Sequence, residues 1–175
     1  MRRKIIKIFE NAATLAVSAA VIVMLGYAIS GTPVIAQVEG ASMEPGYLSG
    51  DAYICAPGWD IGEAAVLNDP SRSRILVKRV VAEGPCRVSW DENGAISVDG
   101  SVLYEPYARY GPGSAGECDV PEGYLFVAGD NRHVSYDSRS FGAVPPESVR
   151  GKPVLQIRYG SDATGKEAEP DAADP

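Results

Sequence analysis

The stretch Ile75-Leu76-Val77-Lys78-Arg79-Val80-Val81 predicts one β-strand, because its residues other than the lysine and the arginine are apolar and mostly β-branched. A lysine inside such a run can be carried into apolar surroundings, where burial disfavours its charged form. A pKa about two to three below the ordinary lysine value of about 10.4 makes a useful general base near neutral pH. The alternative is a solvated lysine beside Arg79 on an edge strand, and the spacing alone leaves both open.

Short runs of the same kind lie on both sides of this stretch, separated by turn signals. We expect strands at 35–38, 52–55, 64–67, 75–82, 87–90, 95–98, 125–128 and 154–159. Asp91-Glu92-Asn93-Gly94 predicts a hairpin turn, because Asn-Gly accepts positive φ. No window after Ser30 has a long apolar period of 3.6 residues, so the fold class is mainly β. The segment 104–120 is rich in glycine and proline and is expected to be a long surface loop.

The N-terminal part has the pattern of a membrane anchor. Residues 1–10 carry four basic residues, and no residue between Glu10 and Glu39 is charged. The apolar run matches the thickness of a bilayer, so 11–31 is predicted to be a single transmembrane helix. The alternative is a cleaved secretory signal peptide, with small residues near Ala36 as a possible cleavage site. The usual apolar region of such a peptide is shorter, about 7–15 residues.

Charge is distributed unevenly along the 175 residues. The formal net charge is -7, which argues against a nucleic-acid partner. Four of the 16 basic residues but only one of the 23 acidic residues lie in the first ten positions. A basic leader with an acidic remainder places 1–10 in the cytoplasm and 32–160 outside it. The acidic tail, 161–175, has no large apolar residue and is expected to be disordered.

The three cysteines and the one histidine do not have the spacing of metal ligands, so no metal or cofactor is predicted. An odd number of cysteines leaves at least one thiol free or paired between chains. A disulfide between Cys86 and Cys118 is possible in a domain outside the cytoplasm, and three reduced thiols are the alternative.

A candidate nucleophile lies upstream of the lysine strand, in Ser42-Met43-Glu44-Pro45. A serine hydroxyl is a poor nucleophile unless a base takes its proton. The one histidine, His133, lies among polar loop residues, where a solvated histidine is the ordinary explanation. Lys78 is therefore the better candidate for the base. Taken alone, Ser42 could equally be an ordinary turn serine.

Two further stretches complete a pattern, Gly129-Asp130-Asn131-Arg132 and Ser135-Tyr136-Asp137-Ser138-Arg139. Together with Ser42 and the lysine strand, in this order and behind an apolar segment, they resemble the type I signal peptidases, from that segment to about residue 159. Those enzymes are membrane-anchored serine proteases with a lysine base. The resemblance implies a coiled antiparallel β-sheet catalytic domain with its active site near the bilayer.

The resemblance also implies a role for each matching residue. Ser42 would be the nucleophile and Lys78 the general base. Ser135 would hydrogen-bond Lys78 and orient it. Asp137 and Arg139 would form a supporting ion pair, with Asp130 as a further supporting acid. From their alternation, Ser135, Asp137 and Arg139 are expected on one side of an extended segment.

Two positions depart from the pattern of that family. Some members carry a serine where this chain has Gly40, two residues before the nucleophile, as an oxyanion donor, and Ala41 is the other residue preceding Ser42. Threonine is usual where this chain has Gly46. Five residues beside the nucleophile and the base are predicted to line shallow apolar substrate pockets: Ala36, Val38, Met43, Leu76 and Val77.

The resulting expectation is a monomeric membrane-bound serine endopeptidase that removes N-terminal signal peptides from exported preproteins at a bacterial cell membrane. Its partners would be those preproteins and the lipid bilayer. One alternative is a narrow-specificity processing protease of the same clan, for pilin or conjugation proteins. A self-cleaving Ser–Lys repressor would need a DNA-binding module. A non-catalytic membrane-anchored β-domain is the remaining alternative.

Overall fold

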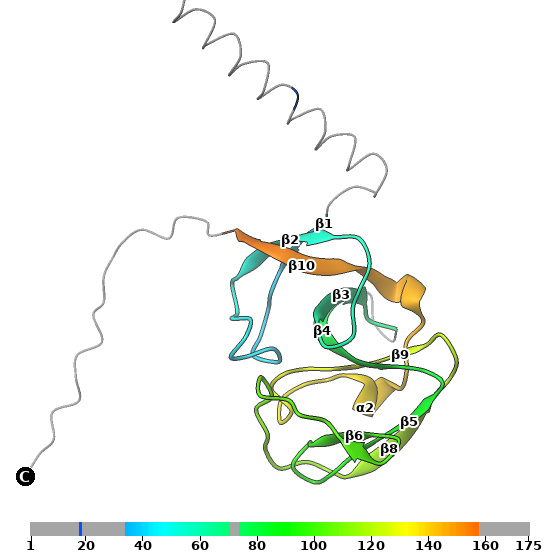
Figure 1. Cartoon of the computed structure of the whole chain (residues 1–175). Helices are drawn as coiled ribbons and strands as arrows, with labels where there is room; N and C mark the ends of the chain where they lie inside the picture. The colour runs from blue at the N-terminus through cyan, green and yellow to red at the C-terminus, as the bar shows by residue number, and fades with distance from the viewer. Residues whose placement is uncertain (1–17, 19–33, 71–73, 158–175) are drawn as a thin grey trace, which may run out of the picture.

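A computed structural model describes residues 18, 34–70 and 74–157 of the chain (Figure 1). Apart from Ser18, the predicted membrane helix 11–31 lies outside the described residues, and so does the acidic tail 161–175. Within the described ranges, no helix is long and apolar enough to cross a membrane. The architecture that follows is therefore that of the predicted catalytic domain.

Most of the domain is a six-stranded sheet with the strand order β1-β2-β10-β3-β4-β9. Every pairing in it is antiparallel, and β10 joins β2 on one side to β3 on the other. Its strands are β1 (Val34–Gln37), β2 (Ala52–Ala56), β3 (Ala64–Asn68), β4 (Ile75–Glu83), β9 (Leu125–Ala128) and β10 (Val149–Ile157). A shift in register within β10 lets this one strand bend between the two neighbours.

A smaller, four-stranded sheet lies at the opposite end of the domain from β1 and β2 (Figure 1). Its order is β7-β6-β5-β8, with strands β5 (Cys86–Trp90), β6 (Ile96–Val98), β7 (Ser101–Val102) and β8 (Gly116–Val120). The turn between β5 and β6 is the predicted hairpin: Asp91 N–H donates to Ala95 O, and Gly94 has φ of 87°. A short helix, α2 (Ser138–Phe141), and a 3₁₀ turn, η1 (Pro146–Ser148), precede β10.

Strand β4 is the centre of the fold, because residues 76–82 are buried on both faces. One face of β3 and β4 packs with β1 and β2 in a first core cluster. The opposite face packs with β9 in a second cluster. A third cluster joins the far end of β4 and β9 to the smaller sheet. A polar side chain on β4 is therefore held among apolar groups whichever way it points.

The sequence prediction of a mainly β, antiparallel domain is confirmed, and the expected strands are present with small shifts at their ends. The prediction of a surface loop over 104–120 is wrong in part, because β8 occupies its last five residues. Alternation within Gly116–Val120 is nearly hidden by its two acidic residues, which lie on the exposed face. The packing of Val120 against the third cluster is what places this strand.

Candidate active site

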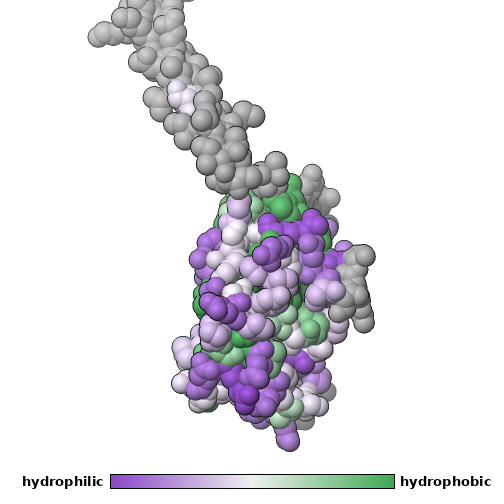
Figure 2. Space-filling model, turned by 90° about the vertical axis from the view of Figure 1, so that its right-hand side faces the viewer, coloured by the Kyte–Doolittle hydropathy of each residue, from purple (hydrophilic) through white to green (hydrophobic). Residues whose placement is uncertain are grey.

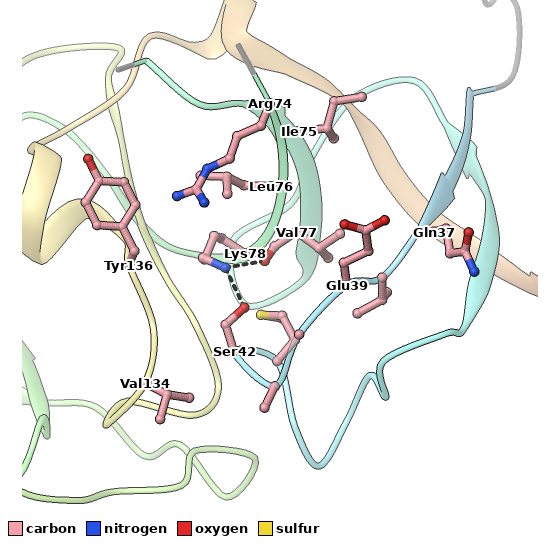
Figure 3. Close-up of a pocket in the computed structure, with 14 residues that line it drawn as sticks. Gln37, Glu39, Ser42, Arg74, Ile75, Leu76, Val77, Lys78, Val134 and Tyr136 are labelled. Atoms are coloured by element: carbon pink, nitrogen blue, oxygen red, sulfur yellow. Dashed lines mark hydrogen bonds between the residues drawn. The ribbon is translucent and has the colours of Figure 1, made fainter. Parts of the chain in front are cut away.

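The structure brings Ser42 and Lys78 into direct contact, although 36 positions separate them (Figure 3). Lys78 Nζ lies 2.7 Å from Ser42 Oγ and 2.9 Å from the carbonyl oxygen of Val77. A distance of 2.7 Å is within the reach needed for proton transfer between a nucleophile and its base. The two residues come from β4 and from the turn that follows β1.

Burial sets the charge of Lys78. Its side chain extends from the centre of β4, and the residue is only 3% exposed. Desolvation lowers its pKa to about 8, because water no longer stabilises the ammonium ion. Asp137, Asp130 and Asp69 oppose this change through their negative charge, while Arg74 adds to it. The net result is a lysine that is substantially neutral near physiological pH.

Ser42 is fixed through its backbone. Its carbonyl oxygen accepts a hydrogen bond of 3.0 Å from the N–H of Asn131, which ties the nucleophile to the Gly129–Arg132 turn. Two residues earlier, Gly40 has φ of 79°, a conformation that glycine adopts freely, and its N–H donates to Ser49 Oγ at 3.1 Å. Gly40 and Ala41 are both exposed beside the nucleophile. The turn thus presents Ser42 at the surface of the sheet.

A groove of about 740 Å³ opens over the Ser42–Lys78 pair (Figure 3). Of the five predicted pocket residues, Val38, Met43, Leu76 and Val77 line it. Ala36 does not, which corrects the prediction: it is buried in the first core cluster, opposite Tyr53 of β2. Its methyl group is enclosed by that packing and does not reach the groove.

The groove also has members that the sequence prediction missed. They are Gln37, Glu39, Arg74, Ile75, Val134 and Tyr136. In Figure 3, Arg74 and Tyr136 lie on the side of the groove away from Glu39. Arg74 is paired with Asp69 at 2.7 Å and lies 5.3 Å from the centre of the Tyr136 ring. Alternation along 134–137 was the available signal, since one set of alternate residues had been assigned to the site and the other had not.

Two buried ion pairs hold the residues behind the pair. Arg139 binds the carboxylate of Asp137 at 2.9 Å through both Nε and Nη2. Arg79 makes a bidentate contact with Asp130, at 2.8 and 2.6 Å. The Asp137 carboxylate also accepts the N–H of Gly129 at 2.9 Å. Arg139 lies in α2, not in an extended segment, and Asp137 is the N-cap of that helix.

Ser135 does not make the hydrogen bond to Lys78 that the resemblance implied. Its Oγ is buried, without a hydrogen-bond partner among the described residues. It borders a second, smaller cavity with Trp90 and Arg139, while its neighbours Val134 and Tyr136 face the groove. Gly129 separates Ser135 from the nucleophile: a Cβ there would lie 2.2 Å from Ser135 Oγ and 2.5 Å from Ser42 O. Ser135 is therefore near the pair, and its positioning role stays a prediction.

The rival base and the predicted disulfide are not supported by the arrangement. His133 is exposed, and its Nδ1 lies 2.8 Å from Pro112 O, so it does not contact Ser42. Cys55, Cys86 and Cys118 are all free in the described domain. No cluster of potential metal ligands is found among the residues that the structure describes.

A family model described as "Signal peptidase, peptidase S26" matches residues 8–157. The chain belongs to this signal peptidase family. Signal peptidase I of Bacillus caldolyticus is 32% identical over 142 residues, which cover 70% of this chain and 76% of that protein. Signal peptidase I of Leptolyngbya laminosa is 33% identical over 96 residues, which cover 54% of this chain and 47% of the relative. The family resemblance and the class of enzyme, a serine peptidase, are thereby confirmed.

More distant relatives have the same kind of name. Thylakoidal processing peptidase 1 of Arabidopsis thaliana is 36% identical over 90 residues, which cover 49% of this chain and 25% of that protein. A solved signal peptidase I from Enterococcus faecalis has a TM-score of 0.45 with this chain at 24% identity, over 55% of this chain and 97% of the other. That score is too low to support any argument about the site.

Proposed function

We propose that this signal peptidase family member is a membrane-bound serine endopeptidase that removes N-terminal signal peptides from exported preproteins. Ser42 would be the nucleophile and Lys78 the general base. The observation that carries the proposal is the 2.7 Å contact between Lys78 Nζ and Ser42 Oγ, with the lysine buried and its pKa lowered to about 8. A neutral amine at that distance can take the serine proton.

The reaction would follow from these two groups. Neutral Lys78 takes the proton of Ser42 Oγ, which attacks the scissile carbonyl. The resulting ammonium ion gives the proton to the leaving amine, and the peptide bond breaks. The signal peptide remains as an ester on Ser42. Lys78, neutral again, takes a proton from water, which attacks the ester, and then returns that proton to Ser42. No metal or cofactor is needed for any step.

The groove would hold the substrate as an extended strand. Backbone from 38–42 and from 74–77 borders the groove on two sides, so an extended peptide could lie between them. Val38, Met43, Leu76 and Val77 are apolar and restrict the space near the nucleophile. Small side chains, one and three residues before the cleavage site, would fit such shallow pockets.

The proposed placement has 1–10 in the cytoplasm, 11–31 across a bacterial cell membrane and 32–160 outside. Exposed apolar side chains on β1 and β10, namely Ile35, Val154 and Leu155, support it. Apolar surface gathers at the same end of the domain (Figure 2). An anchor would raise the effective concentration of enzyme and substrate on one membrane face. A monomer is proposed, since each element of the site comes from one chain.

Cleavage of a preprotein by the purified full-length protein in detergent tests the proposal, with mass spectrometry to locate the cut. Wild type is expected to cut after a small-x-small sequence, and Ser42→Ala and Lys78→Ala to abolish the cut. His133→Ala is the control, because this exposed residue does not contact the pair. Equal cleavage by the Lys78→Ala protein would refute the lysine base. No cleavage by wild type would favour a narrow-specificity protease or a non-catalytic domain.

A further inference from the structure

The segment around Glu105 is buried, although its sequence predicted a surface loop. Glu105 forms an ion pair with Arg132 at 2.5 Å, and both side chains are only 1% exposed. One carboxylate oxygen, Oε1, accepts from Arg132 Nη2 and from the hydroxyl of Tyr107 at 3.0 Å. Buried ion pairs are expensive to form and leave an uncompensated charge when one partner is removed. Glu105 therefore stabilises whatever Arg132 holds.

Arg132 holds the turn next to the nucleophile. Its Nε donates to Gly129 O at 3.0 Å, and its Nη1 donates to Gly94 O at 2.8 Å in the β5–β6 hairpin turn. All three of its donor nitrogens are thus used by buried acceptors. The guanidinium fixes the first residue of the Gly129–Arg132 turn relative to the smaller sheet, which places this turn at the junction of the two sheets.

The same segment also bonds to the turn through its backbone. Arg109 N–H donates to Asp130 O at 2.7 Å, and Arg132 N–H donates to Arg109 O at 2.9 Å. Between these two bonds lies Asn131, whose N–H donates to Ser42 O. The path from Glu105 to the nucleophile is therefore short: an ion pair, a turn, and one backbone hydrogen bond.

Tyr107 extends the same support to the strand that carries the base. Its ring lies over the guanidinium of Arg79, 3.8 Å from the ring centre, while its hydroxyl donates to Glu105. Arg79 directly follows Lys78 and binds Asp130 and the carbonyl of Gly62. Burial, and then the charge of Glu105, raise the pKa of Tyr107, so its hydroxyl stays a donor. One buried segment thus contacts the supports of both Ser42 and Lys78.

The geometry points to Glu105 and Tyr107 as positioning residues for the Ser42–Lys78 pair. They touch neither the substrate groove nor the two reacting atoms, and they act through Arg132, Arg79 and the 129–132 turn. This inference rests on the proposed peptidase function. A misplacement of about 1 Å between reacting groups can cost about 100-fold in rate. Loosening the turn should therefore lower kcat, while substrate binding in the groove is largely retained.

The variants are chosen to separate charge, hydrogen bond and packing. Glu105→Gln keeps an oxygen acceptor for Arg132 but removes the charge. Glu105→Ala removes both. Tyr107→Phe keeps the ring over Arg79 and loses only the hydroxyl. Glu117→Gln is the matched control, because its carboxylate is exposed on β8 and only loosely paired with Arg87, at 3.8 Å.

Kinetics use the full-length protein in detergent and an internally quenched peptide with a small-x-small site. Glu105→Ala is expected to lower kcat by about 10- to 100-fold with KM changed by less than about threefold. Glu105→Gln and Tyr107→Phe should fall between it and wild type, and Glu117→Gln should match wild type. Rates are compared per folded molecule, well below each melting temperature. An unchanged kcat in a variant whose Tm has fallen would show a merely structural role and overturn the inference.

A second readout does not need activity. The Asn131 amide should exchange with deuterium at least about tenfold faster in Glu105→Ala, because its bond to Ser42 O is weakened. If wild type fails to cleave, the proposed function fails, and exchange alone decides the inference. If Glu105→Ala does not fold, Tyr107→Phe gives the same comparison. Exchange equal to wild type in the folded variants would overturn the positioning role.

Discussion

Replacing Lys78 by methionine should remove both catalysis and a pH dependence of stability. Methionine has a similar length and no charge, and it suits the apolar surroundings of β4. In the wild type the folded-state pKa is about 8, while the unfolded chain has the ordinary value of 10.5. The unfolded state therefore binds more protons than the folded state between these two pH values, so stability rises with pH there.

The size of this effect follows from the pKa difference. Each pKa unit corresponds to about 1.4 kcal/mol, so the fall from 10.5 to about 8 corresponds to about 3 kcal/mol. The wild type should lose that amount, relative to the methionine variant, as the pH falls from about 10.5 to about 8. At pH 7 the same lowering raises the neutral fraction of Lys78 by about 300-fold. Activity should consequently rise with pH through an apparent pKa near 8.

Two assays check these numbers on the full-length protein in detergent. Denaturant unfolding of the wild type and of Lys78→Met at a series of pH values gives the difference in unfolding free energy, in which other titrating groups cancel. The pH dependence of kcat/KM, with the quenched peptide, gives the pKa of the free enzyme. A parallel pair of stability curves, or an activity pKa near 10, would refute a desolvated lysine base.

Three further perturbations test other parts of the site. Gly129→Ala should lower kcat by at least about tenfold, because its Cβ would collide with Ser135 and with the carbonyl of Ser42, while Gly113→Ala, which has room, should be silent in the same peptide assay. Arg79→Leu should cost about 3–5 kcal/mol of unfolding free energy by leaving Asp130 buried and unpaired, and a cost below 1 kcal/mol would contradict this. EDTA should leave cleavage unchanged, since the base is an amine; a loss restored by a divalent ion would refute the mechanism.

The sequence predicted most strands and the two residues of the reacting pair, because β-branched runs and a lysine inside one of them are local signals. It could not predict the pairing of Arg79 with Asp130 or of Arg132 with Glu105, since these contacts depend on how distant segments fold together. The segment holding Glu105 was predicted to be solvated because it is short and rich in proline and glycine. Only its docking between the two sheets shows that its charge is buried.

Ser135 shows a second limit of sequence reasoning. Alternation correctly separates Ser135 from Val134 and Tyr136, but it cannot say which set faces the substrate groove. The structure places Val134 and Tyr136 on the groove and Ser135 on the other cavity. Ala36 fails for a related reason, because alternation puts it on the same face as Val38 without showing that β2 covers it.

The alternation along 134–137 has a consequence for changing what the protein cleaves. Val134 and Tyr136 face the groove, whereas Asp137 binds Arg139 and the backbone of Gly129. Selectivity and scaffold are thus carried by different residues of one short segment. A library that varies only 134 and 136 could explore new cleavage preferences while the buried ion pairs remain intact, so this segment offers an economical starting point for directed evolution.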